Sequence, residues 1–126
     1  MITWEQLART DPWWVSRMID RGLLDAVDLS NALMALGQTA PTLAYPRLLR
    51  AMRHDAPMVR ESALLALTDT SPRTEELLNT VMDLALSDNS SGVRLTAKEA
   101  LQVITSPLTP LQRLQNWYVR LILRVF

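Results

Sequence analysis

The sequence contains no cysteine, and this absence excludes several classes of protein at once. A chain without cysteine forms no disulfide, offers no thiolate to a zinc ion and has no thiol nucleophile. Nothing in it indicates an oxidising compartment, so we expect a cytoplasmic protein. The first residues, MITWEQLARTDPWW, include early acidic side chains and no apolar run, so we expect no signal peptide.

Long apolar runs and an excess of charge of one sign are also missing, and glycine occurs only three times. No segment approaches the roughly 18 consecutive apolar residues of a membrane-spanning helix. Thirteen basic and thirteen acidic residues cancel, which removes any overall attraction to nucleic acid or to an anionic membrane. With 126 residues and 48% hydrophobic residues, the chain is long and apolar enough for one domain with its own core.

The local patterns favour helices throughout. No segment alternates between polar and apolar residues, and no Asn-Gly or Asp-Gly hairpin signal occurs. Capping side chains stand just before proline at Asp11, Ser71 and Thr109, which is typical of helix N-termini. We therefore predict an all-α fold with helices near residues 3–9, 12–21, 23–36, 43–53, 56–68, 72–87, 92–104 and 110–125.

One motif occurs twice. HDAPMVRESALLAL, residues 54–67, is followed by SDNSSGVRLTAKEAL, residues 87–101, and the Val-Arg pair that begins at Val59 recurs 34 residues later at Val93. A weaker third copy without the Val-Arg pair begins near Asp28. The repeated apolar and small residues fall on one stripe of a helix. Each helical hairpin is therefore expected to bury one face against the next.

These two segments resemble the second helices of HEAT repeats, which carry an aspartate at the turn, a Val-Arg pair shortly after it, and alanine and leucine at helical spacing. The resemblance implies a short right-handed α-solenoid of about three HEAT-like helical hairpins with capping helices at both ends. In that family the turn aspartate and the arginine form a ladder between successive units. The resemblance thus implies structural roles for Asp55, Arg60, Asp88 and Arg94.

The predicted organisation is a single HEAT-like domain over residues 1–126. Residues 1–22 form a tryptophan-rich N-terminal cap, residues 23–104 form the helical repeats, and residues 105–126 form an apolar and basic helix. Large aromatic side chains can seal the end of a solenoid that has no further neighbour. Trp13 and Trp14 are adjacent and point in different directions, so one of them could instead anchor an interface.

The sequence offers few candidates for catalytic or metal-binding groups. His54 is the single histidine, and a His-Asp pair with Asp55 could act as a general base. A histidine at the end of a helix also interacts favourably with the helix dipole without any catalytic role. No serine stands in a nucleophile motif and no metal ligands occur at suitable spacing. We therefore expect neither an enzyme nor a metal or other cofactor; an enzyme resembling the HEAT-containing chromophore lyases in fold alone ranks below the binding functions.

Three arginines follow one stripe of the helix predicted over residues 43–53, namely Arg47, Arg50 and Arg53. Such a stripe could contact nucleic-acid phosphates. A solvated face that forms salt bridges with a neighbouring acidic hairpin explains the same pattern. Nucleic-acid binding is therefore the alternative function rather than the first.

The last predicted helix, LQRLQNWYVRLILRVF, has an apolar face too wide for a helix that shows one side to water. Intramolecular packing against the N-terminal aromatic residues is the first explanation, a homodimer or another partner the second, and a membrane surface the third. The surface of the second helices is a further candidate, because it changes from apolar to charged along the repeats.

The function predicted from these patterns is a non-catalytic protein-binding module, such as an adaptor, a regulator or an inhibitor of the immunity type. Its expected partner is another protein, with a homodimer through the last helix as a further option and a membrane as an unlikely one. The predicted partner-binding residues are Glu61, Leu64, Leu65, Lys98, Glu99, Gln102, Trp117 and Arg120.

Overall fold

The structure is a computed structural model, and it describes residues 2–68 and 71–105 together with residues 114, 117 and 121. Within this part of the chain all regular structure is helical, as the sequence predicts, and no strand occurs. The helices are α1 (Trp4–Thr10), α2 (Pro12–Asp20), α3 (Ala26–Thr39), α4 (Pro41–Ala51), α5 (Pro57–Leu65), α6 (Glu75–Ser87) and α7 (Ser91–Thr105).

Side-chain caps define where four of these helices begin. Thr3, Asp11, Asp25 and Thr74 each accept a hydrogen bond from a backbone N–H in the first turn of α1, α2, α3 and α6. These bonds satisfy donors that have no partner inside the helix. Proline occupies the first turn of α2, α4 and α5, where its missing N–H costs nothing.

Helix α3 runs three residues further than the sequence predicted, and Gly37 lies inside it instead of ending it. A glycine is present at this position because α3 and the end of α5 approach each other closely. A β-carbon on Gly37 would lie 3.1 Å from the Cβ atom of Ala66 and 3.2 Å from its carbonyl oxygen. Glycine is therefore present because of tertiary packing, and the prediction of a helix end at this residue was wrong.

Other boundaries also differ from the prediction: α3 begins at Ala26 instead of residue 23, and α4 lies two residues earlier than predicted. Helix α6 begins at Glu75 instead of residue 72, because the hydroxyl of Ser71 accepts a hydrogen bond from the backbone N–H of Thr68 and Thr74 serves as the cap. Helix α5 ends at Leu65. The helix predicted over residues 110–125 lies outside the described residues except for 114, 117 and 121, which are helical.

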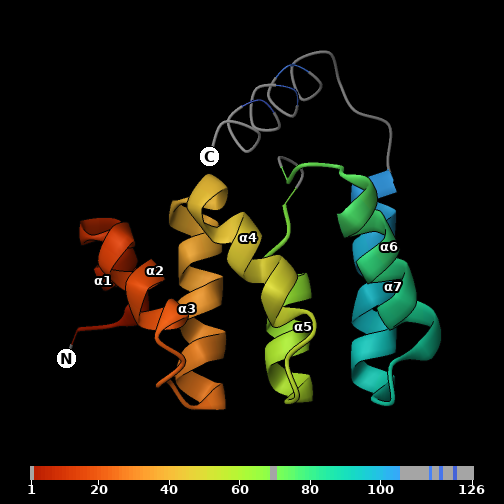
Figure 1. The fold of residues 1–126 in the computed structure, drawn as a ribbon, viewed down its shortest axis with the longest axis horizontal. Coiled ribbons are helices and arrows are strands. Elements are labelled where there is room, and N and C mark those ends of the chain that lie inside the picture. Colours follow the sequence, from red (N-terminus) through yellow and green to blue (C-terminus); the bar gives the residue numbers. More distant parts are fainter. Residues whose placement is uncertain (1, 69–70, 106–113, 115–116, 118–120, 122–126) are drawn as a thin grey trace.

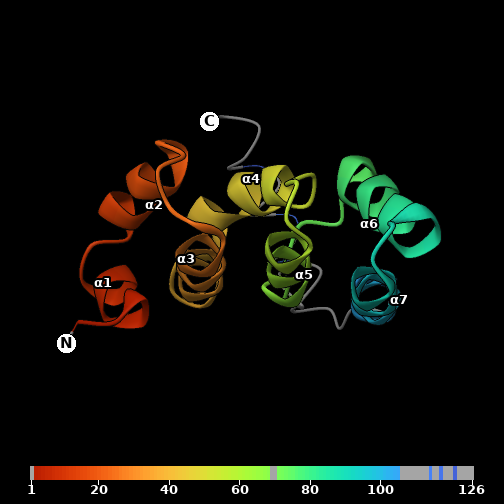
Figure 2. The ribbon, with the colours of Figure 1, turned by 90° about the horizontal axis from the view of Figure 1, so that it is seen from below.

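The helices form two layers (Figures 1 and 2). Helices α1, α3, α5 and α7 lie in one row, and each contacts the next along the row. Helices α2, α4 and α6 lie in the second row, and the successive hairpins are α2–α3, α4–α5 and α6–α7. Below, α2, α4 and α6 are called first helices, and α3, α5 and α7 second helices. This arrangement is a short helical solenoid, as predicted.

The repeated alanines lie where the hairpins pack together. Ala32, Ala63 and Ala97 occupy equivalent positions of the three second helices, and all three are fully buried. The valines of the two Val-Arg pairs are also buried. Small side chains at these positions let helices of adjacent hairpins approach closely. The core predicted from helical spacing is therefore present.

Candidate protein-interaction surfaces

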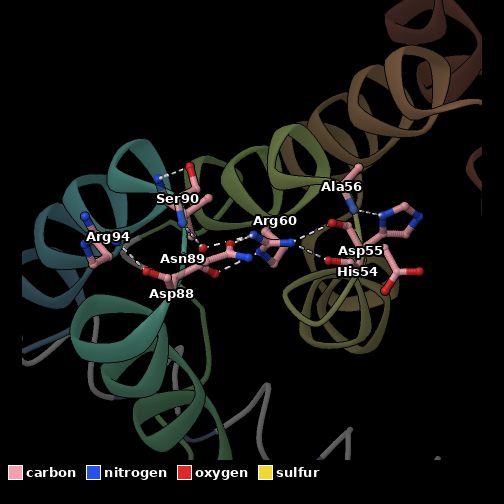
Figure 3. Close-up of polar contacts among 9 residues, drawn as sticks. His54, Asp55, Ala56, Arg60, Asp88, Asn89, Ser90 and Arg94 are labelled. Atoms are coloured by element: carbon pink, nitrogen blue, oxygen red, sulfur yellow. Dashed lines mark hydrogen bonds and ion pairs between the residues drawn. The ribbon is translucent and has the colours of Figure 1, made fainter.

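Arg60 joins the second and third hairpins (Figure 3). Its Nε and Nη2 atoms donate to the two carboxylate oxygens of Asp88 at 2.8 and 2.9 Å. Its Nη1 atom donates to the backbone carbonyl oxygens of His54 and Asp55 at 2.8 and 2.9 Å, which are in the turn before its own helix. Arg60 is only 8% exposed, so this two-pronged ion pair lies between the units and has a structural role.

The environment of Asp88 keeps its carboxylate ionised. Burial on its own would raise the pKa of Asp88. The hydrogen bonds from Arg60 and from the backbone N–H of Ser90, together with the charges of Arg60 and Arg94, outweigh that effect. The pKa of Asp88 therefore lies below its ordinary value of 3.8. The ion pair is charged at any pH at which the protein would be expected to work.

The ladder implied by the family resemblance is formed between one pair of units. Arg94 repeats the contact of Arg60 within its own unit, donating from Nη1 to the backbone carbonyl of Asp88 at 2.6 Å. Asp55 differs from Asp88, because its side chain is exposed and makes no hydrogen bond to any residue that the structure describes. Leu29 occupies the position upstream that aligns with Arg60, so no arginine is present to reach Asp55. The predicted ladder role of the Asp55 side chain is therefore wrong.

Two predicted partner-binding residues of α5 are covered, wholly or in part, by the rest of the described structure. Leu64 is 2% exposed and belongs to the core, so its assignment to a binding surface was wrong. Glu61 is half-buried, and its Oε1 atom accepts a hydrogen bond of 3.1 Å from the hydroxyl of Thr96 in α7. At Glu61, the surface of the second helices that was predicted to bind a partner is therefore in contact with the next hairpin.

The outward side of the second helices carries exposed apolar side chains. Leu65 of α5 is 55% exposed, as the partner-binding prediction requires. Val27 of α3 and Met58 of α5 are exposed to a similar degree and were missed in the sequence. The missed signal is the repeat register, because Val27 and Met58 occupy equivalent positions of successive second helices. We call Val27, Met58 and Leu65 the outer face.

The remaining predicted partner-binding residues lie near the C-terminal side of the described structure. Lys98, Glu99 and Gln102 of α7 are exposed. Trp117 is exposed as well, and Arg120 lies outside the described residues. These positions therefore remain candidates for contact with a partner.

The arginine stripe has partners within the chain. The Nη2 atoms of Arg47 and Arg50 donate to the two carboxylate oxygens of Asp20 in α2, at 2.7 and 2.8 Å. Burial would raise the pKa of Asp20, but the hydrogen bonds and charges of both arginines bring it below 3.8. Arg53 donates to the hydroxyl of Thr80 in α6 at 3.4 Å. The stripe therefore forms salt bridges within the chain, as the second explanation of the pattern predicts. The acidic partner, Asp20, comes from the preceding hairpin.

The N-terminal aromatic residues divide between packing and exposure. The rings of Trp4 and Trp14 stack with their centroids 6.3 Å apart, and the indole N–H of Trp4 donates to Asp28 of α3. Trp13 is exposed on α2. Of the two adjacent tryptophans, Trp14 thus contributes to the stack and Trp13 points outward.

His54 lies in the turn between α4 and α5 and has a structural contact. Its Nδ1 atom accepts a hydrogen bond of 3.0 Å from the backbone N–H of Ala56, the residue that precedes α5. Across the described residues, no group of three or more histidine, aspartate or glutamate side chains is arranged to hold a metal ion. No helix in the same part of the chain is both long enough and apolar enough to cross a membrane.

Comparison with known families agrees with the repeat. The family model of HEAT repeats matches residues 24–102, which is more than half of the chain. The chain belongs to the HEAT-repeat family. HEAT repeats are commonly protein-interaction modules. No curated protein and no solved structure matches this HEAT-repeat chain, so the surfaces described above carry the argument about its function.

Proposed function

We propose that this HEAT-repeat chain is a non-catalytic protein-binding module, and that it binds a partner protein through the outer face. The observation that supports this proposal is the exposure of Val27, Met58 and Leu65 on one side of consecutive second helices. Apolar side chains gathered on the surface are more favourable when a partner removes them from water.

The surroundings of the outer face fit a protein partner better than a small ligand. The carboxylates of Asp28 and Glu99 are exposed near its two ends, on α3 and α7. An apolar centre with a charged rim is typical of protein interfaces. An adaptor, a regulator and an inhibitor of the immunity type would all use such a surface in the same way, and none of them requires a cofactor.

The experiment is a pull-down with the tagged full chain from an extract of its natural source, treated with nuclease at moderate salt. The wild type is compared with Leu65→Glu, which places a charge on the outer face. Leu23→Glu is the matched control, because Leu23 is also an exposed leucine, at 77% against 55% for Leu65, and lies in the turn between α2 and α3. Circular dichroism confirms that each variant is folded.

We expect one defined protein to bind the wild type and Leu23→Glu, and to be lost with Leu65→Glu. Equal capture by all three chains would contradict a role for the outer face. If only nucleic acid were retained, and only at low salt, the arginine stripe of Arg47, Arg50 and Arg53 would become the better explanation.

A further inference from the structure

The third hairpin exposes positions that are covered in the hairpin before it. Leu64 and Lys98 are equivalent in α5 and α7, and Leu64 is buried whereas Lys98 is exposed. Glu61 and Leu95 are equivalent in the same way. Glu61 bonds to α7, but Leu95 is 60% exposed. Helix α7 thus exposes to solvent the side that, in α5, contacts the next hairpin.

Helix α6 shows the same relation to α4. Arg53, an exposed residue that follows α4, donates to Thr80 of the next hairpin, and Leu86 of α6 is its equivalent. Leu86 is 75% exposed. Met82, one turn earlier on the same side of α6, is also exposed, although its equivalent in α4, Leu49, is half-buried. Two large apolar side chains therefore continue the exposed side of α7 onto α6.

Arg94 lies beside this exposed side, and only part of its guanidinium is used. Arg60 binds the turn of its own unit through Nη1 and the aspartate of the following unit through Nε and Nη2. Arg94 makes the first of these contacts, to the carbonyl of Asp88. Its Nε and Nη2 atoms donate to nothing in the part of the chain that the structure describes. By repeat equivalence, they are the atoms that would hold a carboxylate from a following unit.

We call Met82, Leu86, Arg94, Leu95 and Lys98 the terminal face. We propose that the terminal face binds a helical hairpin of a partner protein whose inter-helix turn carries an aspartate. The partner's two helices pack on α6 and α7 as α6 and α7 pack on the hairpin before them. The aspartate accepts hydrogen bonds from Nε and Nη2 of Arg94, as Asp88 does from Arg60.

Two features of the molecule select this occupant. The first is continuity, because the same side of the preceding hairpin already binds a hairpin with an aspartate in its turn. The second is charge, because Arg94 and Lys98 are one helical turn apart on α7 and both are positive. Residues 106–126 contain no aspartate or glutamate, so no side chain of that segment can supply the carboxylate. The terminal face is separate from the outer face, and neither proposal depends on the other.

The experiment uses photo-crosslinking with the full chain in cells of its natural source. Benzoylphenylalanine replaces Leu95 in one chain and Leu65 in a second, and mass spectrometry maps the residues that are cross-linked. The Leu95 probe is also combined with Arg94→Glu. Thermal unfolding shows whether Arg94→Glu is folded. If that variant is unfolded, Lys98→Glu tests the positive charge of the terminal face instead, because Lys98 is an exposed residue.

We expect the probe at position 95 to cross-link to the helices or turn of a hairpin with an aspartate in the turn. Charge reversal at Arg94 or Lys98 should reduce the yield by roughly tenfold or more, because it places like charges at a docked contact. Replacing the partner's aspartate by arginine should restore cross-linking to Arg94→Glu.

Four results would overturn the proposal. Cross-linking from position 65 but not from position 95 would leave the outer face in use and the terminal face unoccupied. A cross-link from position 95 to a second copy of this chain, or one unaffected by both charge reversals, would identify a different occupant. The absence of any protein cross-linked from either position would contradict this proposal and the proposed function together.

Discussion

Replacing Arg60 by methionine tests whether the ion pair between the second and third hairpins stabilises the fold. Methionine keeps an unbranched apolar side chain in place of the arginine stem and removes all the donors. The carboxylate of Asp88, whose side chain is only 5% exposed, then loses both donors from Arg60. The carbonyl oxygens of His54 and Asp55 lose one donor each.

Removing one partner of a buried ion pair costs about 3–5 kcal/mol, because the other charge stays buried without compensation. A domain of this size has a free energy of unfolding of about 5–15 kcal/mol, so the variant should lose a large share of it. Arg94→Met is the matched control at the equivalent position. Arg94 is half-buried and makes one described hydrogen bond, so its loss should cost about 1 kcal/mol.

The assay is urea unfolding followed by circular dichroism, extrapolated to water. Adding Asp88→Asn to Arg60→Met removes the uncompensated charge. The double variant should therefore lose less stability than the sum of the two single variants, by about 0.5–3 kcal/mol. Equal losses for Arg60→Met and Arg94→Met, or strictly additive losses for Arg60→Met and Asp88→Asn, would refute the reasoning.

Three further outcomes are expected. The pKa of Asp88 is lower in the folded chain than its ordinary value of 3.8, so the stability that the ion pair contributes is fully present above that value and is lost as the pH falls through the folded pKa. Urea midpoints should therefore fall steeply in acid for the wild type and less steeply for Arg60→Met, and parallel curves would contradict the assignment. Gly37→Ala should lower the unfolding temperature, at a cost of about 1–3 kcal/mol from crowding, whereas Gly92→Ala, whose added β-carbon would meet no atom closer than 3.6 Å, should gain about 0.5–1 kcal/mol from helix propensity. Shifts in the same direction would show that packing does not distinguish the two sites. Asp20→Asn should cost about 1 kcal/mol or less, since the Asp20 side chain is 37% exposed, and a loss that does not shrink in high salt would argue against ion pairing there.

Much of the architecture could be predicted from spacing alone. The recurrence of the Val-Arg pair, with alanine at helical intervals, predicts stackable hairpins, because only one stripe of each helix can be buried against its neighbours. The turn aspartate and the arginine of the motif meet as the family resemblance implies, at Arg60 and Asp88. Helix caps such as Asp11 could also be predicted from the sequence, because capping hydrogen bonds are local and need no tertiary partner.

The interaction surfaces could be predicted only in part. Leu64 and Leu65 are adjacent and chemically identical, yet one is buried and the other is exposed. Which of them is covered depends on how the neighbouring helices α3, α4 and α7 pack on α5, and no pattern within α5 encodes that packing. Gly37 is a similar case, because its neighbour Ala66 comes from another helix.

The sequence by itself determined that the chain is helical, that its hairpins repeat, and which residues of each hairpin are alike, because these properties follow from local propensity and periodicity. Only the tertiary structure decided which contacts the equivalent residues of successive hairpins make. Arg60 and Arg94 stand in the same motif, but Arg60 lies between two hairpins and binds an aspartate. Arg94 lies where the described repeats end, and two of its donor atoms have no partner among the described residues. The physical reason is that burial and pairing belong to a residue's neighbours in space, and equivalent positions in a solenoid have different neighbours in its middle and at its end.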